Sequence, residues 1–272
     1  MNTAKFVSKV LAIGLLSLVV GCGGKNSTTS STTNTAPAGS TPMPVVIDAG
    51  PAALVKANQG TANIVYASIS ICTPGTSTCQ TIDHIQVDTG STGLRILNSA
   101  LNGTVTPTPL IDGSSNPIAE CVVFADGHTW GSVVLVDVQM GGSTLSKVPV
   151  NIIGASSVGA DPSACSKGNG PAEQTQAAFG ANGILGVGNF VQDCGYNCSV
   201  KATNNQYFSC PSGTNCVSTA VPLLAQVTNP VSLMPVDKNG VTLSFPAVTA
   251  PGALTVSGTL YFGVNTQTTD PT

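Results

Sequence analysis

One short turn in the sequence carries residues suited to acid–base chemistry. Asp88-Thr89-Gly90-Ser91 follows one apolar, β-type run directly and precedes another, residues 92–97. A carboxylate at this place can activate a water molecule. The small residues Thr89 and Gly90 let the backbone approach and bond the carboxylate, and Ser91 can bond its outer oxygen. All four residue types are common in turns, so the motif taken alone is better read as a surface turn.

The sequence offers few other candidates for catalysis or for metal binding. It has no Gly-x-Ser-x-Gly elbow, and its Gly-rich segments lack the lysine of a phosphate loop. His84 and His128 match no metal motif, so each is interpreted as a solvated or packed residue. Cys194-Gly-Tyr-Asn-Cys198 lacks the spacing and the nearby histidine of a zinc site. We therefore expect no metal and no cofactor, and the net charge of -3 gives no basic surface for nucleic acid.

The elements that must position these residues are expected to be short strands. Only 8% of the residues are charged, and 30 Gly and 18 Pro punctuate the chain. Helical patterns are confined to residues 171–179 and 220–227. The predicted fold is therefore mainly β. Runs rich in β-branched and aromatic residues predict strands at residues 64–71, 82–87, 133–140, 148–153, 241–245 and 255–262.

Three later segments give the Asp88 turn a context. Residues 124–142 resemble the flap hairpin of pepsin-like aspartic proteases and the strand after it. Gly183-Ile184-Leu185-Gly186 resembles the strand that threads past the catalytic loop, and residues 258–264 resemble the strand that closes the amino-terminal lobe. The resemblance covers about residues 60 to 265. It implies one pepsin-like lobe, a double-psi-type β-barrel with few short helices.

The resemblance assigns roles residue by residue. It makes Asp88 the catalytic aspartate, supported by Thr89, Gly90, Ser91, Ile184, Leu185 and Gly186. It places the flap and the substrate cleft at Phe124, Asp126, Gly127, Trp130 and Gly131. Phe124 stands where pepsins have a tyrosine, and Trp130 offers either a compensating indole N–H or a plain hydrophobic contact. Asn182 replaces an aspartate, with a structural consequence expected.

A narrower resemblance is to a family of bacterial lipoproteins of unknown function that share the pepsin-like pattern. It rests on Thr92-Gly93-Leu94-Arg95, Trp130-Gly131 and Asn229-Pro230-Val231. The sequence also departs from pepsin, because it has no second Asp-Thr-Gly or Asp-Ser-Gly. Asp112-Gly113-Ser114 lacks the intervening residue and is interpreted as a turn.

The missing second motif leaves three functions open. Aspartic-protease chemistry needs two carboxyl groups about 3 Å apart that share one proton. The first expectation is an aspartic endopeptidase that cleaves peptide or protein substrates, provided a missing carboxyl-terminal lobe or a second chain in a homodimer supplies the other aspartate. The second is a non-catalytic module that binds a peptide strand. The third is a structural lipoprotein that retains only the fold.

The amino terminus predicts export and a lipid anchor. Lys5 and Lys9 precede an apolar run, residues 10–20, which is shorter than the roughly 20 residues that span a bilayer. Cys22 follows this run and resembles a lipobox cysteine; the alternative is an ordinary secretory signal with an incidental cysteine. We expect a signal peptide at 1–21, a lipidated cysteine and Ser/Thr-rich tether at 22–43, and one lobe at 44–272. The membrane is then a partner through the anchor. The location is the cell envelope, and we expect the outer membrane.

The cysteine count fits an oxidising compartment. Without Cys22, eight of the nine cysteines remain, enough for four disulfides. Spacing favours pairing between near neighbours, with one longer bridge left over. The pairs expected on this basis are Cys72–Cys79, Cys194–Cys198, Cys210–Cys216 and Cys121–Cys165.

Overall fold

The computed structural model describes residues 39–213 and 215–265. The expected signal peptide, the lipidation site Cys22 and most of the expected tether lie outside these residues. The first strand begins at Met43. In the described part of the chain, no helix is long and apolar enough to cross a membrane.

Short strands dominate the described residues, so the prediction of a mainly β fold is confirmed. They alternate with Gly-, Pro- and Asn-containing turns, as the composition predicts. The strands are β1 (Met43–Ile47), β2 (Val65–Cys72), β3 (Cys79–Asp88), β4 (Thr92–Leu97), β5 (Thr108–Pro109), β6 (Ile118–Val123), β7 (His128–Met140), β8 (Ser143–Ile153), β9 (Gly183–Val187), β10 (Tyr207–Ser209), β11 (Val217–Ser218), β12 (Val241–Ser244) and β13 (Val256–Phe262).

The helices of the described chain are all one or two turns long. The α-helices are α1 (Ala52–Lys56), α2 (Ser163–Ser166), α3 (Gln176–Phe179) and α4 (Tyr196–Val200). The 3₁₀ turns are η1 (Asn98–Ala100), η2 (Ser156–Val158), η3 (Pro211–Gly213), η4 (Leu223–Ala225) and η5 (Pro230–Leu233).

Both segments with a helical pattern form a single short turn, within the one or two turns that the sequence predicts. In the segment 171–179 this is α3, and left-handed Gly180 (φ 69°) ends it. In the segment 220–227 it is the 3₁₀ turn η4. Pro222 fixes where this turn begins, because the residue before a proline is disfavoured in the helical region.

Six strands close into a barrel. Neighbouring strands pair in the order β7-β8-β4-β9-β3-β2, and an additional β2–β7 pairing completes the ring. Two pairings in the ring, β3–β9 and β4–β8, are parallel, and the others are antiparallel. The interior is filled by branched apolar side chains, among them the fully buried Ile69, Ile85, Leu94, Val136 and Leu185. This barrel is the scaffold that holds the Asp88 turn.

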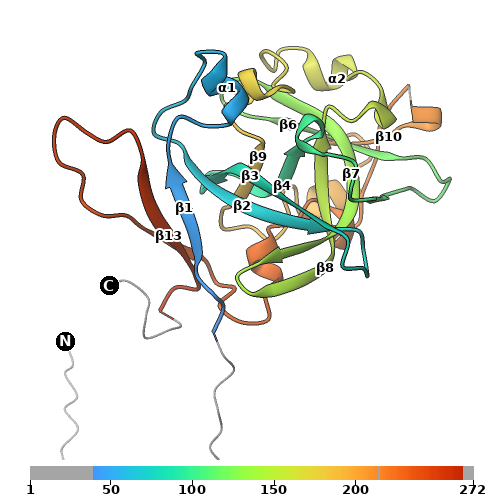
Figure 1. The fold of residues 1–272 in the computed structure, drawn as a ribbon. Coiled ribbons are helices and arrows are strands. Elements are labelled where there is room, and N and C mark those ends of the chain that lie inside the picture. Colours follow the sequence, from blue (N-terminus) through green and yellow to red (C-terminus); the bar gives the residue numbers. More distant parts are fainter. Residues whose placement is uncertain (1–38, 214, 266–272) are drawn as a thin grey trace, which may run out of the picture. The chain divides into compact units, whose positions relative to one another are not determined.

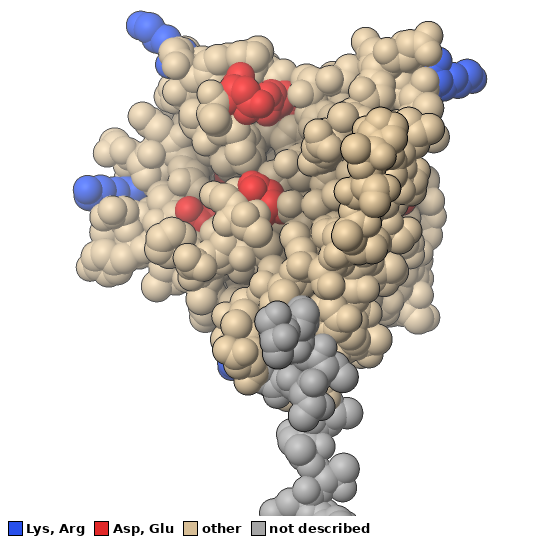
Figure 2. All heavy atoms as spheres, turned by 90° about the vertical axis from the view of Figure 1, so that its left-hand side faces the viewer, with Lys and Arg blue, Asp and Glu red and all other residues tan. Residues whose placement is uncertain are grey.

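Three further strands extend the same sheet beyond the barrel. β1 pairs with β2 and with β13, and β13 pairs with the edge strand β12. The hairpin formed by β12 and β13 therefore lies to one side of the barrel (Figure 1). No Lys, Arg, Asp or Glu occurs between Lys238 and Asp270. The surface visible from this side is correspondingly poor in charge (Figure 2).

Four disulfides stabilise the loops, and their pairing is the one expected from the sequence. Three close short loops: Cys72–Cys79, Cys194–Cys198 and Cys210–Cys216. The fourth, Cys121–Cys165, joins β6 to α2 across 44 residues of sequence. Such a set of bridges is typical of proteins in oxidising compartments.

Candidate functional site

Asp88 lies where two barrel strands meet. It is the last residue of β3, and its partner in the parallel β3–β9 ladder is Gly186. The backbone then turns and returns as β4, which pairs antiparallel with the same strand β9. The Gly90 backbone N–H donates a hydrogen bond to Asp88 Oδ1 at 2.8 Å. The turn therefore holds a half-buried carboxylate with its other oxygen free for a ligand.

The strand β9 runs between β3 and β4 only because glycines permit it. A Cβ atom on Gly186 would lie 2.6 Å from the Thr92 backbone nitrogen and 2.7 Å from the Ser91 carbonyl carbon. A Cβ on Gly183 would lie 2.3 Å from the carbonyl oxygen of Arg95. Ile184 and Leu185 fill the space between these two glycines and are buried. The placement of all three residues, Ile184, Leu185 and Gly186, beside the Asp88 turn follows the expectation from the sequence.

Ser91 does not bond the carboxylate as the sequence suggested. Its Oγ is buried and has no hydrogen-bond partner among the described residues. It is directed towards β9, because a Cβ on Gly186 would meet this oxygen at 2.8 Å. Gly90, rather than Ser91, therefore supplies the hydrogen bond that orients Asp88.

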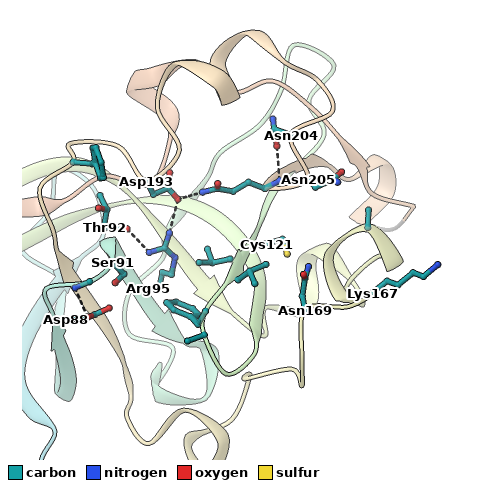
Figure 3. Close-up of a pocket in the computed structure, with 18 residues that line it drawn as sticks. Asp88, Ser91, Thr92, Arg95, Cys121, Lys167, Asn169, Asp193, Asn204 and Asn205 are labelled. Atoms are coloured by element: carbon teal, nitrogen blue, oxygen red, sulfur yellow. Dashed lines mark hydrogen bonds and ion pairs between the residues drawn. The ribbon is translucent and has the colours of Figure 1, made fainter.

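A cleft opens beside Asp88. Its volume is about 840 Å³, and its walls come from the Asp88 turn, the flap hairpin, α2 and the segments around residues 190 and 205. Figure 3 shows Asp88 at one end and Lys167 at the far side, with the Lys167 amine directed outward. The lining residues are Asp88, Gly90, Ser91, Thr92, Arg95, Cys121, Val122, Val123, Phe124, Ala125, Ala164, Lys167, Asn169, Phe190, Asp193, Asn204, Asn205 and Gln206.

Of the flap residues expected at the cleft, only Phe124 lines it. Trp130 is 1% exposed and stacks edge-on against Phe208 in a separate apolar cluster, where its indole N–H donates to the Gly159 carbonyl. Gly131 is packed against β8, with Ile152 O only 2.0 Å from where a Cβ would stand. The assignment of Trp130 and Gly131 to the cleft is therefore corrected: both support the sheet behind the flap.

The flap turn contributes only its first residues to the cleft. Phe124 and Ala125 line it, whereas Asp126 is exposed and does not. Gly127 is buried against the Pro171 carbonyl, which a Cβ would approach to 2.5 Å. The assignment of Asp126 and Gly127 to the cleft is therefore corrected.

A buried ionic network forms one wall of the cleft, and sequence reasoning did not identify it. Arg95 Nη2 donates to Glu120 Oε1 and to Asp193 Oδ2, each at 2.8 Å, and Nη1 donates to the Thr92 carbonyl at 2.7 Å. The side chains of Arg95, Glu120 and Asp193 are 1%, 0% and 4% exposed. The Tyr207 hydroxyl donates to Asp193 Oδ1 at 2.6 Å. Arg95 thus ties strand β6 to the Asp88 turn and to the loop that carries Asp193. Figure 3 shows its contacts with Thr92 and Asp193.

Burial sets the protonation of this network. Burial, followed by the charge of Glu120 and its hydrogen bond, raises the pKa of Asp193 well above its ordinary value. Burial and the charge of Asp193 also raise the pKa of Tyr207. For Arg95, burial alone would lower the pKa, but Glu120 and Asp193 together raise it. Arg95 is therefore charged, and it is the counter-ion of both buried carboxyl groups.

Among the described residues, Asp88 has no second carboxyl group beside it with which to share a proton. Besides Asp88, Asp193 contributes the only carboxyl group to the described cleft, and it is occupied by Arg95, Gln206 and Tyr207. In these ranges of the chain no group of three or more His, Cys, Asp or Glu is arranged to hold a metal ion. The site can therefore activate a water through Asp88, but it lacks a partner to protonate a carbonyl.

Comparison with known proteins places the chain in a family. The family described as "Protein of unknown function (DUF3443)" matches residues 38–271, so the chain belongs to it. No curated protein matches the sequence. Among solved structures, the aspartic proteinase from Irpex lacteus is similar at a TM-score of 0.45 with 16% identity. The match covers 82% of this chain and 47% of that one, so the chain spans about half the length of the proteinase.

Proposed function

We propose that this member of the DUF3443 family is an exported, lipid-anchored envelope protein whose barrel forms one lobe of an aspartic-type endopeptidase. The observation that carries the proposal is the position of Asp88. It ends a barrel strand beside the threading strand β9, faces a cleft of about 840 Å³ and is oriented by the Gly90 N–H. Such a carboxylate is placed to take a proton from an attacking water.

The chemistry requires a second carboxyl group from outside the described residues. Asp88 accepts the proton of the water that attacks the peptide carbonyl, and the partner carboxyl gives its proton to the carbonyl oxygen. The partner comes from a second copy of the chain or from a further lobe. Because Gly90 already donates to one oxygen of Asp88, the other oxygen is the one that faces the water.

A non-catalytic role has an observation of its own. The cleft is bordered by the flap strand β6, whose pairing with β10 ends near Cys121, so the strand continues past its neighbour along the cleft. A peptide can add to such a strand edge through main-chain hydrogen bonds. A peptide-binding envelope protein is therefore the second candidate, and it needs no partner for Asp88.

The location in the envelope is supported by the disulfides and by the sequence around Cys22. Four bridges suit an oxidising compartment. Replacing Cys22 by alanine should release the protein from the detergent phase or leave it unprocessed. Unchanged partitioning of Cys22→Ala into detergent would contradict the lipid anchor.

The peptidase is tested by digestion of casein at acid pH over a range of protein concentrations. We expect cleavage that Asp88→Asn abolishes and that a pepstatin-type inhibitor blocks. Asp126→Asn is the matched control, because Asp126 is an exposed carboxylate that does not line the cleft. If Asp88→Asn retains full cleavage, the assignment of Asp88 is wrong. If no cleavage occurs at any concentration but peptides bind and Phe124→Ala weakens that binding, the second candidate is favoured.

A further inference from the structure

The flap hairpin is fastened to the segment 159–174 through His128. Two backbone hydrogen bonds join them: the His128 N–H donates to the Pro171 carbonyl at 2.9 Å, and the Glu173 N–H donates to the His128 carbonyl at 2.8 Å. The imidazole adds two side-chain contacts. Its Nε2 lies 2.9 Å from Asp161 Oδ2, and its Nδ1 lies 3.1 Å from the Gly170 carbonyl oxygen. The side chain is 3% exposed, so water does not replace these partners.

Both ring nitrogens of His128 face groups that only accept hydrogen bonds. A neutral imidazole carries one N–H, so it can satisfy either the Asp161 carboxylate or the Gly170 carbonyl, but not both. The imidazolium carries two N–H groups and satisfies both at once. Only the imidazolium form can therefore keep both contacts, and the neutral form must lose one of them.

We propose that His128 is a positioning residue whose imidazolium form clamps the flap hairpin, residues 124–128, onto the segment 159–174, and that deprotonation loosens this wall of the cleft. The inference rests on the proposed function in so far as the cleft beside Asp88 is the place where a substrate binds.

The charges around His128 act in the same direction. Asp161 is 24% exposed, Asp126 lies on the turn, and Glu173 is buried on the opposite segment. Burial and then the charge of Asp126 raise the pKa of Glu173, and His128 opposes that rise. Lys167, on the same segment, is exposed and forms no ion pair with the described residues. A neutral His128 would thus remove the cation that pairs with Asp161 and that opposes the effect of Asp126 on Glu173.

Loosening of this clamp would change the shape of the cleft, because the same turn carries a lining residue. Phe124, four residues before His128, lines the cleft and packs edge-on against Phe179 at 6.2 Å between ring centroids. Gly127 has no space towards Pro171, so the turn cannot shift without parting from the segment. Since histidine is the side chain that commonly changes charge between pH 5 and 8, the wall is held at acid pH and loosens as the pH rises through this range.

The chain provides its own reporters for a test. It has two histidines and one tryptophan, Trp130, which follows His128 on β7 and bonds Gly159 at the other end of the clamped segment. In long-range ¹H–¹⁵N spectra of the mature protein at pH 5, we expect His128 to show both nitrogens protonated. Between pH 5 and 8, Trp130 fluorescence should show one transition. Amide protection factors in residues 124–131 should fall about tenfold or more, as expected for the loss of a buried charged hydrogen bond.

Two variants and one control decide the outcome. His128→Gln should abolish the Trp130 transition, whereas His84→Asn should keep it, because His84 lies elsewhere and its positive φ of 49° suits asparagine. Asp161→Asn keeps the imidazole but removes its counter-charge, so the midpoint of the Trp130 fluorescence transition should move to lower pH. This variant provides the test if His128→Gln does not fold. A flat fluorescence profile in the folded wild type, or a midpoint that Asp161→Asn leaves unchanged, overturns the clamp. None of these measurements needs peptidase activity. A protein that shows the expected transitions but cleaves no substrate would therefore support the clamp and refute only the proposed peptidase.

Discussion

Arg95 is the single arginine of the sequence, and the fold buries it beside the candidate site. Its guanidinium group bonds a carbonyl of the Asp88 turn, a carboxylate on the flap strand and a carboxyl on the opposite loop. A planar donor with several N–H groups can join three such segments, whereas a lysine cannot reproduce the paired contacts to Glu120. Arg95 therefore sets the relative positions of the cleft walls.

The first prediction concerns the removal of this cation. Arg95→Met should lower the free energy of unfolding by about 3–5 kcal/mol, because Glu120 would remain as an uncompensated buried charge. Urea unfolding at neutral pH measures the change. Lys167→Met is the matched control, since Lys167 is an exposed cation at the same cleft, and its effect should stay within about 0.5 kcal/mol. An equal, small effect of both variants would contradict a structural role for the network.

The second prediction uses the raised pKa of Asp193. Burial raises this pKa in the folded state, and so do the charge of Glu120 and its hydrogen bond with Asp193. The carboxyl group therefore binds its proton more tightly in the folded than in the unfolded chain. Its contribution to stability is present below the unfolded value, about 4, and is lost as the pH rises through the folded pKa. Asp193→Asn does not titrate. Urea unfolding from pH 4 to 8 should therefore show that this variant gains stability relative to wild type as the pH rises. The opposite trend would contradict the raised pKa of Asp193.

Sequence reasoning reached Asp88 and the strand beside it but not the buried ionic network, and the reason is distance along the chain. Asp88 belongs to a local motif with a recognisable context. Arg95 meets Glu120 and Asp193 across 25 and 98 residues, so no spacing rule links them. The available signal was the charge of Arg95 inside an apolar strand, which indicates a buried partner without naming it. The exposure of Trp130 was misjudged for a similar reason, because its packing partner Phe208 lies on β10.

At the scale of elements, the threading strand β9 is the feature that the sequence predicted best. The short pattern of Gly, two apolar residues and Gly is informative, because a glycine inside a strand often marks a place where another backbone approaches closely, as at Gly183 and Gly186. The helices were predicted in number and length but not in position. Residues 171–179 and 220–227 each form one turn, α3 and η4, with Gly180 after the first and Pro222 before the second. Side-chain propensity alone does not say which residues of such a segment become helical.

The third prediction tests this threading. Gly186→Ala should destabilise the protein by about 1–3 kcal/mol or more, because the new methyl group would press on backbone atoms of Ser91 and Thr92 that cannot move aside. Chemical denaturation compares it with Gly113→Ala, where a Cβ would meet nothing within 4 Å and the backbone is not left-handed. The control should be neutral within about 0.5 kcal/mol. Equal stability of the two variants would show that β9 does not pass as closely as described.

At the scale of the whole molecule, one side of the sheet is left open. The described sheet ends at β12, and the hairpin formed with β13 contains no charged residue. Edge strands are commonly protected from pairing by charged side chains. The absence of charge here means that two copies can approach along this side without electrostatic repulsion. A homodimer that pairs along this edge is therefore physically available, and it would supply the second carboxyl of the proposed peptidase only if it also brings two copies of Asp88 together.

The last prediction distinguishes a homodimeric active site from other sources of the second carboxyl. If two copies of Asp88 form the pair, cleavage at low protein concentration should rise with the square of concentration, and sedimentation equilibrium should show dimers over the same range. Excess Asp88→Asn protein should suppress the activity of wild type, because each mixed dimer carries one carboxylate and one amide. Excess Asp126→Asn should not suppress it. Wild-type activity that is linear in concentration and is not suppressed by excess Asp88→Asn protein would show that a single chain holds both carboxyl groups. The partner of Asp88 would then lie outside the residues described.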